Sequence, residues 1–447
     1  MKQNYWYLAL VGIFIIVVGF VVVRFTVSPA GSETIWLPMK PRTGNNNFAE
    51  WNAAKLNSER LITKLKANGK DTKAALALAN AYNSEGRISG DVMYYDDAAM
   101  KTVMNVLKYQ PDNFEAILLK SMIELSQHHF SEALQTAKSV EQKGVNSAFM
   151  YGLWVDANVE MGNYDEALLA ADKMVSIRPD LRSYSRISYL REIYGDNEGA
   201  IEAMKLAVQA GLTGDEKTEW CRAQLGKLYE NNGDLTRAAL QYNLSLAARP
   251  GYVQALAGLG RIAAFSSKND SALYYFEQAN KLTEDVTIKQ GLSLAYANVG
   301  KIEESKKLAN AVIERMKLNS NAAEATPETG HYSDKELAYA YAQSKDNLNA
   351  LRHALLEYNR RPKNIEVNET VAWVYYKKND FKSAIPFLET ALSTKSMKPQ
   401  LLCLAGLLYT AAGEKSKAKT MLTLGLRKNA LMPLDLLQES KQALQTL

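Results

Sequence analysis

The sequence predicts an all-α protein, a solenoid of antiparallel helix pairs preceded by a transmembrane helix. Two observations lead to this fold class. A pair of apolar helical stripes separated by a turn recurs along most of the 447 residues, and a long apolar run stands near the N-terminus. The apolar content of 47% is ample for a core. Because repeated units share their core with neighbours, we expect one elongated array rather than several domains.

The clearest helix pair lies within 220–250. Leu225, Leu228 and Tyr229 recur at helical spacing and form one apolar stripe. Gly233 breaks the helix, a second stripe follows, and a proline ends it at position 250. The segment therefore predicts two helices that pack against each other.

Small and large residues alternate in this pair as close packing requires. Gly226 and Ala238 are small where the helices approach, and Tyr229 and Tyr242 fill the remaining gap. Small, large, turn, small, large and proline at this spacing resemble the tetratricopeptide repeat, whose unit is about 34 residues. The resemblance implies a right-handed superhelical α-solenoid without catalytic chemistry of its own. Within it, the segment 185–211 is similar to bacterial repeat proteins of undefined activity.

Copies of the pattern follow along the chain and give about ten units over 71–430. The first unit is degenerate, with an insertion predicted at 87–95. The small and large positions that carry the copies include Trp154, Ala167, Ile187, Ala200, Leu259, Ala272, Leu292, Ser305, Leu337, Ala350, Val371, Ala384, Ala405 and Ala418.

The N-terminal residues 1–26 are predicted to be a transmembrane anchor or a signal peptide. Residues 5–23 are almost wholly apolar and long enough to span a bilayer as a helix. Small residues at 28–30 offer a signal-peptidase site, but the apolar run exceeds the usual signal core, which favours an uncleaved anchor. The resulting hypothesis is a single-pass inner membrane protein.

The side of the membrane on which the repeats lie is open to two interpretations. Arg24, Lys40 and Arg42 follow the apolar run and slightly favour repeats in the cytoplasm. The short tail before the run resembles bacterial signal-anchored envelope proteins, which implies extracytoplasmic, periplasmic repeats, and this is the reading we prefer. A cleaved, secreted form is a further alternative.

The rest of the chain divides by composition. Residues 27–47 contain prolines, a glycine and an Asn triplet and predict a linker. Residues 48–70 predict an N-terminal capping helix, and 433–447 predict a C-terminal one. Between them we expect a block of units at 71–317, a loop or hinge at 318–332, and further units at 333–432.

No motif for catalysis, metal or cofactor binding stands out, so we expect a protein that is not an enzyme and has no cofactor. The four histidines lack Cys, Asp or Glu at metal-ligand spacing, and each is interpreted as structural. Gly258 and Gly260 lie in a predicted helix, where glycine serves close packing. A net charge of +5 is slight, and no basic stripe interleaved with aromatics suggests nucleic acid.

The resemblance places a binding groove on the first helix of each unit. Its groove positions correspond to a set of cations and aromatic residues, and Tyr and Trp are typical anchors of interfaces. The carboxylate-clamp pattern of the family is not matched. The predicted partner-binding residues are Arg182, Tyr189, Trp220, Lys227, Arg261, Tyr339 and Trp373.

Two functions compete at this point. The first is a membrane-anchored scaffold or adaptor whose concave groove holds a peptide segment or helix of a partner protein. The alternative is an envelope-assembly component that recognises glycan or secreted polymer machinery, in which Tyr339 and Trp373 stack on sugar rings. The sequence does not identify the partner, the process or the oligomeric state.

Overall fold

The computed structural model describes residues 35–44, 48–141, 144, 146–325, 330–427 and 430–447. The chain divides into two compact units, 1–38 and 39–447. Of the first, only residues 35–38 are described, and they form neither helix nor strand. The predicted anchor at 1–26 lies outside the described residues. No helix among the residues described is both long enough and apolar enough to cross a membrane.

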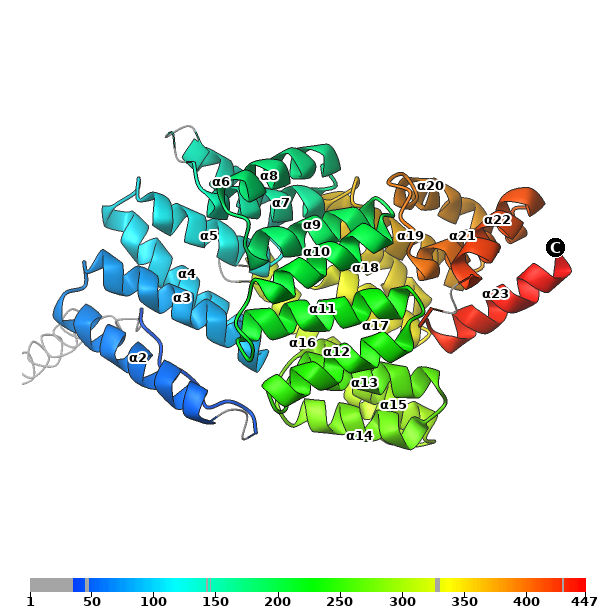
Figure 1. The fold of residues 1–447 in the computed structure, drawn as a ribbon, viewed down its shortest axis with the longest axis horizontal. Coiled ribbons are helices and arrows are strands. Elements are labelled where there is room, and N and C mark those ends of the chain that lie inside the picture. Colours follow the sequence, from blue (N-terminus) through cyan, green and yellow to red (C-terminus); the bar gives the residue numbers. More distant parts are fainter. Residues whose placement is uncertain (1–34, 45–47, 142–143, 145, 326–329, 428–429) are drawn as a thin grey trace, which may run out of the picture. The chain divides into compact units, whose positions relative to one another are not determined.

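The compact part formed by 39–447 is all-helical where it is described, with 22 helices from α2 to α23 and no strand (Figure 1). This confirms the predicted helical solenoid. Helix α2 (Phe48–Ala67) comes first and α23 (Leu434–Thr446) last. The twenty helices between them form ten consecutive antiparallel pairs, here called units 1 to 10. The pairs are α3 (Thr72–Ser89) with α4 (Val92–Tyr109), α5 (Phe114–Ser126) with α6 (Phe130–Glu141), α7 (Ala148–Met161) with α8 (Tyr164–Ile177), α9 (Leu181–Ile193) with α10 (Asn197–Gln209), α11 (Glu216–Asn231) with α12 (Leu235–Ala248), α13 (Val253–Phe265) with α14 (Asn269–Asn280), α15 (Val286–Asn298) with α16 (Ile302–Ala325), α17 (Asp334–Gln343) with α18 (Asn347–Arg360), α19 (Ile365–Lys377) with α20 (Phe381–Ala391), and α21 (Pro399–Ala411) with α22 (Lys415–Leu426).

One residue register repeats in units 2 to 10. A small or β-branched residue in the first helix precedes a small residue of the second helix by twelve positions, and the second residue is a fully buried alanine in every unit but unit 7. In unit 4, the Ser188 hydroxyl donates to the Ala200 carbonyl at 2.7 Å, and Ser121 and Ser293 make the same bond in their units. The helices therefore approach closely at one fixed level, which aligns every unit with the next. The pairs are Ser121/Ala133, Val155/Ala167, Ser188/Ala200, Gly226/Ala238, Gly260/Ala272, Ser293/Ser305, Ala338/Ala350, Ala372/Ala384 and Gly406/Ala418.

Tyrosine and phenylalanine rings occupy the space that glycine leaves. A Cβ on Gly226 or Gly258 would stand 2.6 Å or 2.3 Å from the ring of Tyr242, and one on Gly260 would stand 2.9 Å from that of Phe276. These contacts confirm the prediction that the helical glycines serve close packing. Tyr242 is fully buried and bridges units 5 and 6.

The turn inside each of these nine units contains a residue with positive φ, seven positions after the small residue. Glycine supplies it in five units, where no Cβ opposes the left-handed conformation. His128, Ser267, Lys345 and Asn379 supply it in the other four. The turn geometry is therefore common to the array, although the residue that adopts it changes.

In each of units 1 to 5, the turn between the two helices contacts a segment that connects later units, about six units further along the chain. The Glu284 amide donates to the Ser89 carbonyl at 3.0 Å, and the Tyr332 amide donates to the Gln127 carbonyl at 3.1 Å. Because about six units separate the partners each time, these contacts fix how the pairs wind. We call this set of contacts the seam. Its five rungs are 89–90 with 283–285, 127–129 with 330–332, 159–164 with 361–365, 195 with 395, and 230 with 431.

The third rung is the most extensive. The Asn364 amide group donates to the carbonyls of Val159 at 3.2 Å and Glu160 at 3.0 Å, and the Ile365 amide donates to the Tyr164 hydroxyl at 2.8 Å. A Cβ on Gly162 would meet the backbone of residue 363 at 2.4 Å. Gly162 is therefore required twice, for its φ of 76° and for this close approach.

The seam explains which turn glycines are crowded. A Cβ on Gly195 would lie 2.6 Å from the Lys395 carbonyl oxygen. Around Gly300 and Gly413, in units 7 and 10, a Cβ would find nothing within 4 Å. The array ends before a partner six units after unit 7 or unit 10 could occur. Glycine at these two turns is therefore needed only because the turn requires a positive φ.

Two local predictions need correction. The stretch 87–95 was expected to be an insertion outside the helices, but α3 runs to Ser89 and α4 starts at Val92, so the extra residues lengthen both helices. The loop predicted at 318–332 starts later, because α16 continues through Ala325. Ala322, Ala323 and Glu324 favour helix, and their propensity outweighs the missing apolar stripe.

The predicted linker also contains packed residues. Met39 is buried, and the Arg42 guanidinium holds the Glu85 carboxylate at 2.6 Å, both side chains being almost fully buried. Glu50 of α2 binds Arg249 at 2.7 Å, so α2 reaches the linker after α12. Cys221 and Cys403 are free and buried, as expected for residues in distant units.

Replacing Arg361 by alanine should strongly destabilise the array. This side chain is 4% exposed, binds Glu357 at 2.6 Å, pairs with Glu160 across the seam, and lies 4.4 Å from the centre of the Phe130 ring. Its loss removes the cation that pairs with Glu160, one of the two cations bound to the buried Glu357, and the contact with Phe130, which together cost about 3 kcal/mol. Urea denaturation measures the effect. Arg178→Ala is the control, because that side chain is 71% exposed in its pair with Asp180 and should cost less than about 1 kcal/mol. Equal losses would contradict a seam that stabilises the array.

Acid should weaken the second rung. Burial lowers the pKa of His128 to about 4, and burial followed by the charge of His128 lowers the pKa of His331 to about 3. Both imidazoles are neutral when folded, whereas the unfolded chain takes up protons as the pH falls through about 6.5. Stability is therefore intact above that pH and falls below it, by on the order of 2 kcal/mol per histidine at pH 5.

Urea denaturation at pH 7.5 and pH 5 tests this sign. The double variant His128→Asn, His331→Asn should lose less stability on acidification than the unmodified protein, and asparagine tolerates the positive φ at 128. An unchanged pH dependence in the variant would show that these two histidines do not carry it.

Candidate functional site

A cavity of about 1440 Å³ lies among the first helices of units 1 to 5 on one side and unit 9 on the other. First helices of successive units contact each other, α3 with α5, α5 with α7, α7 with α9 and α9 with α11, and so form a continuous wall. The opposite wall comes from α19 and the start of α21. The seam brings these two walls together, because it places unit 9 beside unit 3. We call this space the central cavity.

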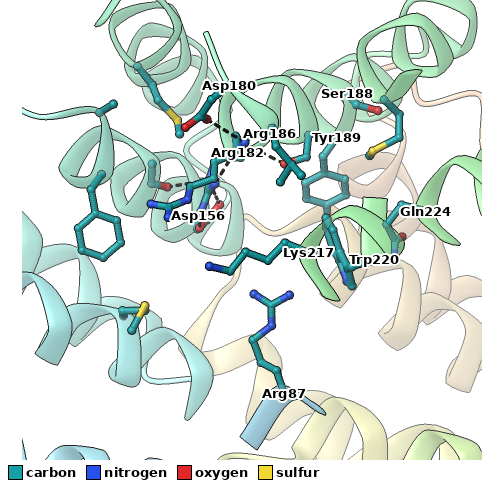
Figure 2. A pocket seen from close by; sticks show the side chains of 18 of the residues that line it. Arg87, Asp156, Asp180, Arg182, Arg186, Ser188, Tyr189, Lys217, Trp220 and Gln224 are labelled. Atoms are coloured by element: carbon teal, nitrogen blue, oxygen red, sulfur yellow. Dashed lines mark hydrogen bonds and ion pairs between the residues drawn. The ribbon is translucent and has the colours of Figure 1, made fainter. Parts of the chain in front are cut away.

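Helices α9 and α11 each present a stripe of side chains to the central cavity. On α11, Lys217, Trp220, Gln224 and Lys227 recur at intervals of three and four residues, so they share one helix face. Figure 2 shows the first three of them, with Arg182 and Tyr189 of α9 beside them. The α11 stripe has a lysine at each end and Trp220 between them, and the α9 stripe begins with Arg182 and includes Tyr189.

Three cations of these stripes lack a partner. Among the residues described, no side-chain hydrogen bond or ion pair joins Arg182, Lys217 or Lys227 to another group, and all three are exposed to the cavity. Burial, followed by the charges of Arg261 and Lys398, lowers the pKa of Lys227. The main cause of this shift is the removal of the ammonium group from bulk water, and the two neighbouring cations add to it.

The other cations at the cavity are paired within the protein. Arg186 donates from Nε to Asp156 at 2.8 Å and to the Gly152 carbonyl at 3.1 Å, and so ties α9 to α7. Arg87 of α3 binds Glu216 of α11 at 3.1 Å. Both pairs hold the wall in position and leave the three cations of the stripes available.

The carboxylates of the opposite wall have lysine partners. Glu366 binds Lys335 at 3.0 Å, and that lysine holds the pKa of Glu366 well below its usual range. Glu369 binds Lys398 at 3.3 Å and raises the pKa of this lysine. The charge of Glu366, together with burial, raises the pKa of Tyr189 on the facing wall. The two walls therefore interact electrostatically across the cavity.

Unpaired charge in the cavity is therefore positive. Glu192 accepts a hydrogen bond from Asn231 at 2.9 Å. Glu115 of α5 is the lining carboxylate for which the described residues provide no hydrogen bond or ion pair. The amide of Asn231 carries no charge, so Glu192 and Glu115 both lack a cationic partner among the described residues, and three unpartnered cations stand against these two carboxylates.

The predicted groove residues divide into two groups. Arg182, Tyr189, Trp220 and Lys227 line the central cavity, and Tyr189 is 38% exposed there. Their role in binding stays a prediction. Arg261 is not in the cavity wall, because its guanidinium binds Glu230 at 3.0 Å and the Tyr242 hydroxyl at 3.2 Å.

Tyr339 and Trp373 also lie outside the cavity wall. Their rings contact each other with centroids 5.1 Å apart, and the Tyr339 hydroxyl accepts a hydrogen bond from Thr370 at 3.1 Å. The sugar-stacking role predicted for them stays a prediction.

Sequence reasoning missed part of the site. Lys217 and Gln224 are three residues before and four residues after Trp220, so helical spacing alone could have identified them. Lys398 could not be found this way, because its place in the cavity wall depends on how distant units meet. The pairing of Arg186 with Asp156 depends on how α9 packs against α7 of the preceding unit, which spacing along one helix does not show.

No group of three or more His, Cys, Asp or Glu side chains in the described part of the chain is arranged to hold a metal ion. Three of the four histidines meet in the seam instead. The rings of His128 and His331 lie 4.2 Å apart, and His129 stacks on Tyr332 at 4.6 Å.

No protein-family model matches the chain. A curated relative, the TPR repeat-containing protein MJ1428 of Methanocaldococcus jannaschii, is 21% identical over 381 residues, which cover 73% of this chain. The match spans 66% of the relative, just under two thirds of its length. The repeated helix pair and this relative agree. The chain is a tetratricopeptide repeat protein. The repeats of this family are scaffolds for protein–protein interaction.

Three solved structures similar to this tetratricopeptide repeat protein have TM-scores below 0.5. TTC0263 of Thermus thermophilus is 20% identical, with a TM-score of 0.37, over 43% of this chain and 97% of its own. A tetratricopeptide repeat protein from Parabacteroides merdae is 15% identical, with a TM-score of 0.34, over 59% and 97%. The human IFIT1 dimer with PPP-AAAA is 15% identical, with a TM-score of 0.44, over 86% and 88%.

Proposed function

We propose that this protein is a membrane-anchored scaffold that holds a segment of a partner protein in the central cavity. The observation that carries the proposal is that two aromatic side chains, the exposed Tyr189 and the partly buried Trp220, lie beside three unpartnered cations on one continuous wall. Aromatic residues and arginine are the types enriched where proteins bind each other.

The size and lining of the cavity favour a polypeptide over a small molecule. Small-molecule sites usually have about 300–1,000 Å³ and mostly apolar walls. The central cavity is larger, at about 1440 Å³, and charged and amide side chains of seven units line it together with apolar ones. A wall held by ion pairs and seam contacts loses little conformational entropy on binding, so modest contacts give useful affinity.

The anchor in the proposal is the apolar segment within 1–26. It would keep the repeats at an inner membrane, and the resemblance to signal-anchored envelope proteins favours the extracytoplasmic side. The right-handed winding and the capping roles of 48–70 and 433–447 belong to the same proposal.

Site-specific photo-cross-linking in cells of the source organism tests this function. A benzophenone amino acid at Gln224, inside the cavity, should give a discrete adduct with a protein partner. The same residue at Leu348, 73% exposed on α18 and outside the cavity wall, is the matched control and should give none. Adducts of equal yield at both positions, or none at Gln224, would contradict binding in the cavity.

The same cells test the anchor. The Gln224 adduct should sediment with membranes in the full chain and appear in the soluble fraction after deletion of 1–26. An adduct that stays soluble in the full chain would remove the anchor from the proposal and leave the cavity untouched.

A further inference from the structure

The unpartnered cations indicate the chemistry of the segment that the central cavity takes. Arg182, Lys217 and Lys227 have no counter-charge among the described residues, whereas the carboxylates of the facing wall are bound by Lys335 and Lys398. A ligand that brings carboxylates into the cavity would pair with these cations without breaking an existing ion pair. Such charge complementarity determines which partners are accepted more than it determines total affinity.

We propose that the central cavity binds an acidic, extended polypeptide segment with an aromatic side chain between its carboxylates. This inference rests on the proposed function and specifies its partner. The carboxylates would pair with Lys217 and Lys227 at the two ends of the α11 stripe. The aromatic side chain would pack on Tyr189 and Trp220, and Gln224 and Asn231 would offer amides to the peptide backbone.

The helix sets the spacing of the acidic residues. Lys217 and Lys227 are ten positions apart on α11, which corresponds to ~15 Å along the axis. An extended chain advances about 3.3 Å per residue. The two carboxylates should therefore be separated by four or five positions in the segment, with the aromatic residue between them.

The walls favour a peptide over a nucleic acid. A nucleic acid carries a charge at every phosphate, and it would be repelled by Glu115 and Glu192, the lining carboxylates that no cation of the described residues pairs with. A peptide with two spaced carboxylates can place uncharged residues beside these glutamates. Cations and aromatic rings alone would suit either ligand, so the interleaved carboxylates decide between them.

Fluorescence anisotropy with the full chain in detergent tests the proposal. The probe is a fluorescein-labelled synthetic peptide with two glutamates five positions apart and phenylalanine between them. Binding should weaken at least tenfold in Lys217→Glu, Lys227→Glu, because both cations become repulsive. The double variant should instead bind the peptide in which lysines replace the glutamates.

The control variant Lys138→Glu, Lys205→Glu carries the same change in net charge on exposed positions of α6 and α10, away from the cavity wall. It should bind the glutamate peptide like the unmodified protein. Circular dichroism on both variants checks that the helices persist.

Two outcomes would overturn the inference. One is equal weakening by both double variants, which would mean that net charge rather than the cavity attracts the peptide. The other is binding of labelled oligothymidylate in preference to the glutamate peptide, which would assign the cavity to a nucleic acid. If the peptide does not bind while the Gln224 cross-link forms, the acidic segment is wrong and the scaffold function stands.

Discussion

Hydrogen bonds between the turn of one helix pair and the linker six pairs later determine the rest of this structure. A chain of helix pairs joined only to their neighbours can bend at every joint, since each pair contacts only the next. Here five rungs tie units 1 to 5 to later parts of the chain. Several of these bonds join backbone groups, so they depend on the conformation of the turn more than on side-chain identity. The positive-φ residue in each turn is therefore a condition of the winding as well as of the hairpin.

The central cavity is a consequence of the seam. The wall of α9 and α11 would be an open groove if the seam were absent, and its cations would face bulk water. With the third rung in place, α19 contributes Glu366 and Glu369 to the opposite side, and the charge of Glu366 reaches Tyr189. Most charged side chains of the two walls have partners, and the exceptions are the cations of the α9 and α11 stripes, Glu115 and Glu192. Binding specificity would then arise from the cations of these stripes, which have no partner within the wound array.

Local patterns in the sequence were sufficient for the repeat. The spacing of Gly226, Ala238 and Tyr242 predicts the hairpin, and its copies predict about ten units, because both depend on contacts within a unit or between neighbours. Four of the predicted groove residues, including Tyr189 and Trp220, share the helix faces that line the central cavity, and their role in binding stays a prediction. The loop predicted at 318–332 failed because absence of an apolar stripe does not prevent helix in an alanine-rich segment.

Long-range contacts were beyond the sequence. Nothing in the spacing of His128 and His331 shows that they meet, because about six units separate them and the winding angle is set by small rotations that add up along the array. The opposite wall of the cavity was hidden for this reason too. Arg261 is a different case, because it pairs with Glu230 of the neighbouring unit and lies outside the cavity wall.

The winding can be measured directly by the distance between two points of the third rung. Spin labels on cysteines at Asp165 and Lys363, both exposed beside the bond between Tyr164 and Ile365, report it by double electron–electron resonance after the buried Cys221 and Cys403 are replaced by serine. A seam as described predicts a narrow distribution at short distance, near the lower limit of the method. A broad distribution on the order of 50 Å or more, as six units stacked at helix-packing distances without a seam would give, would contradict it.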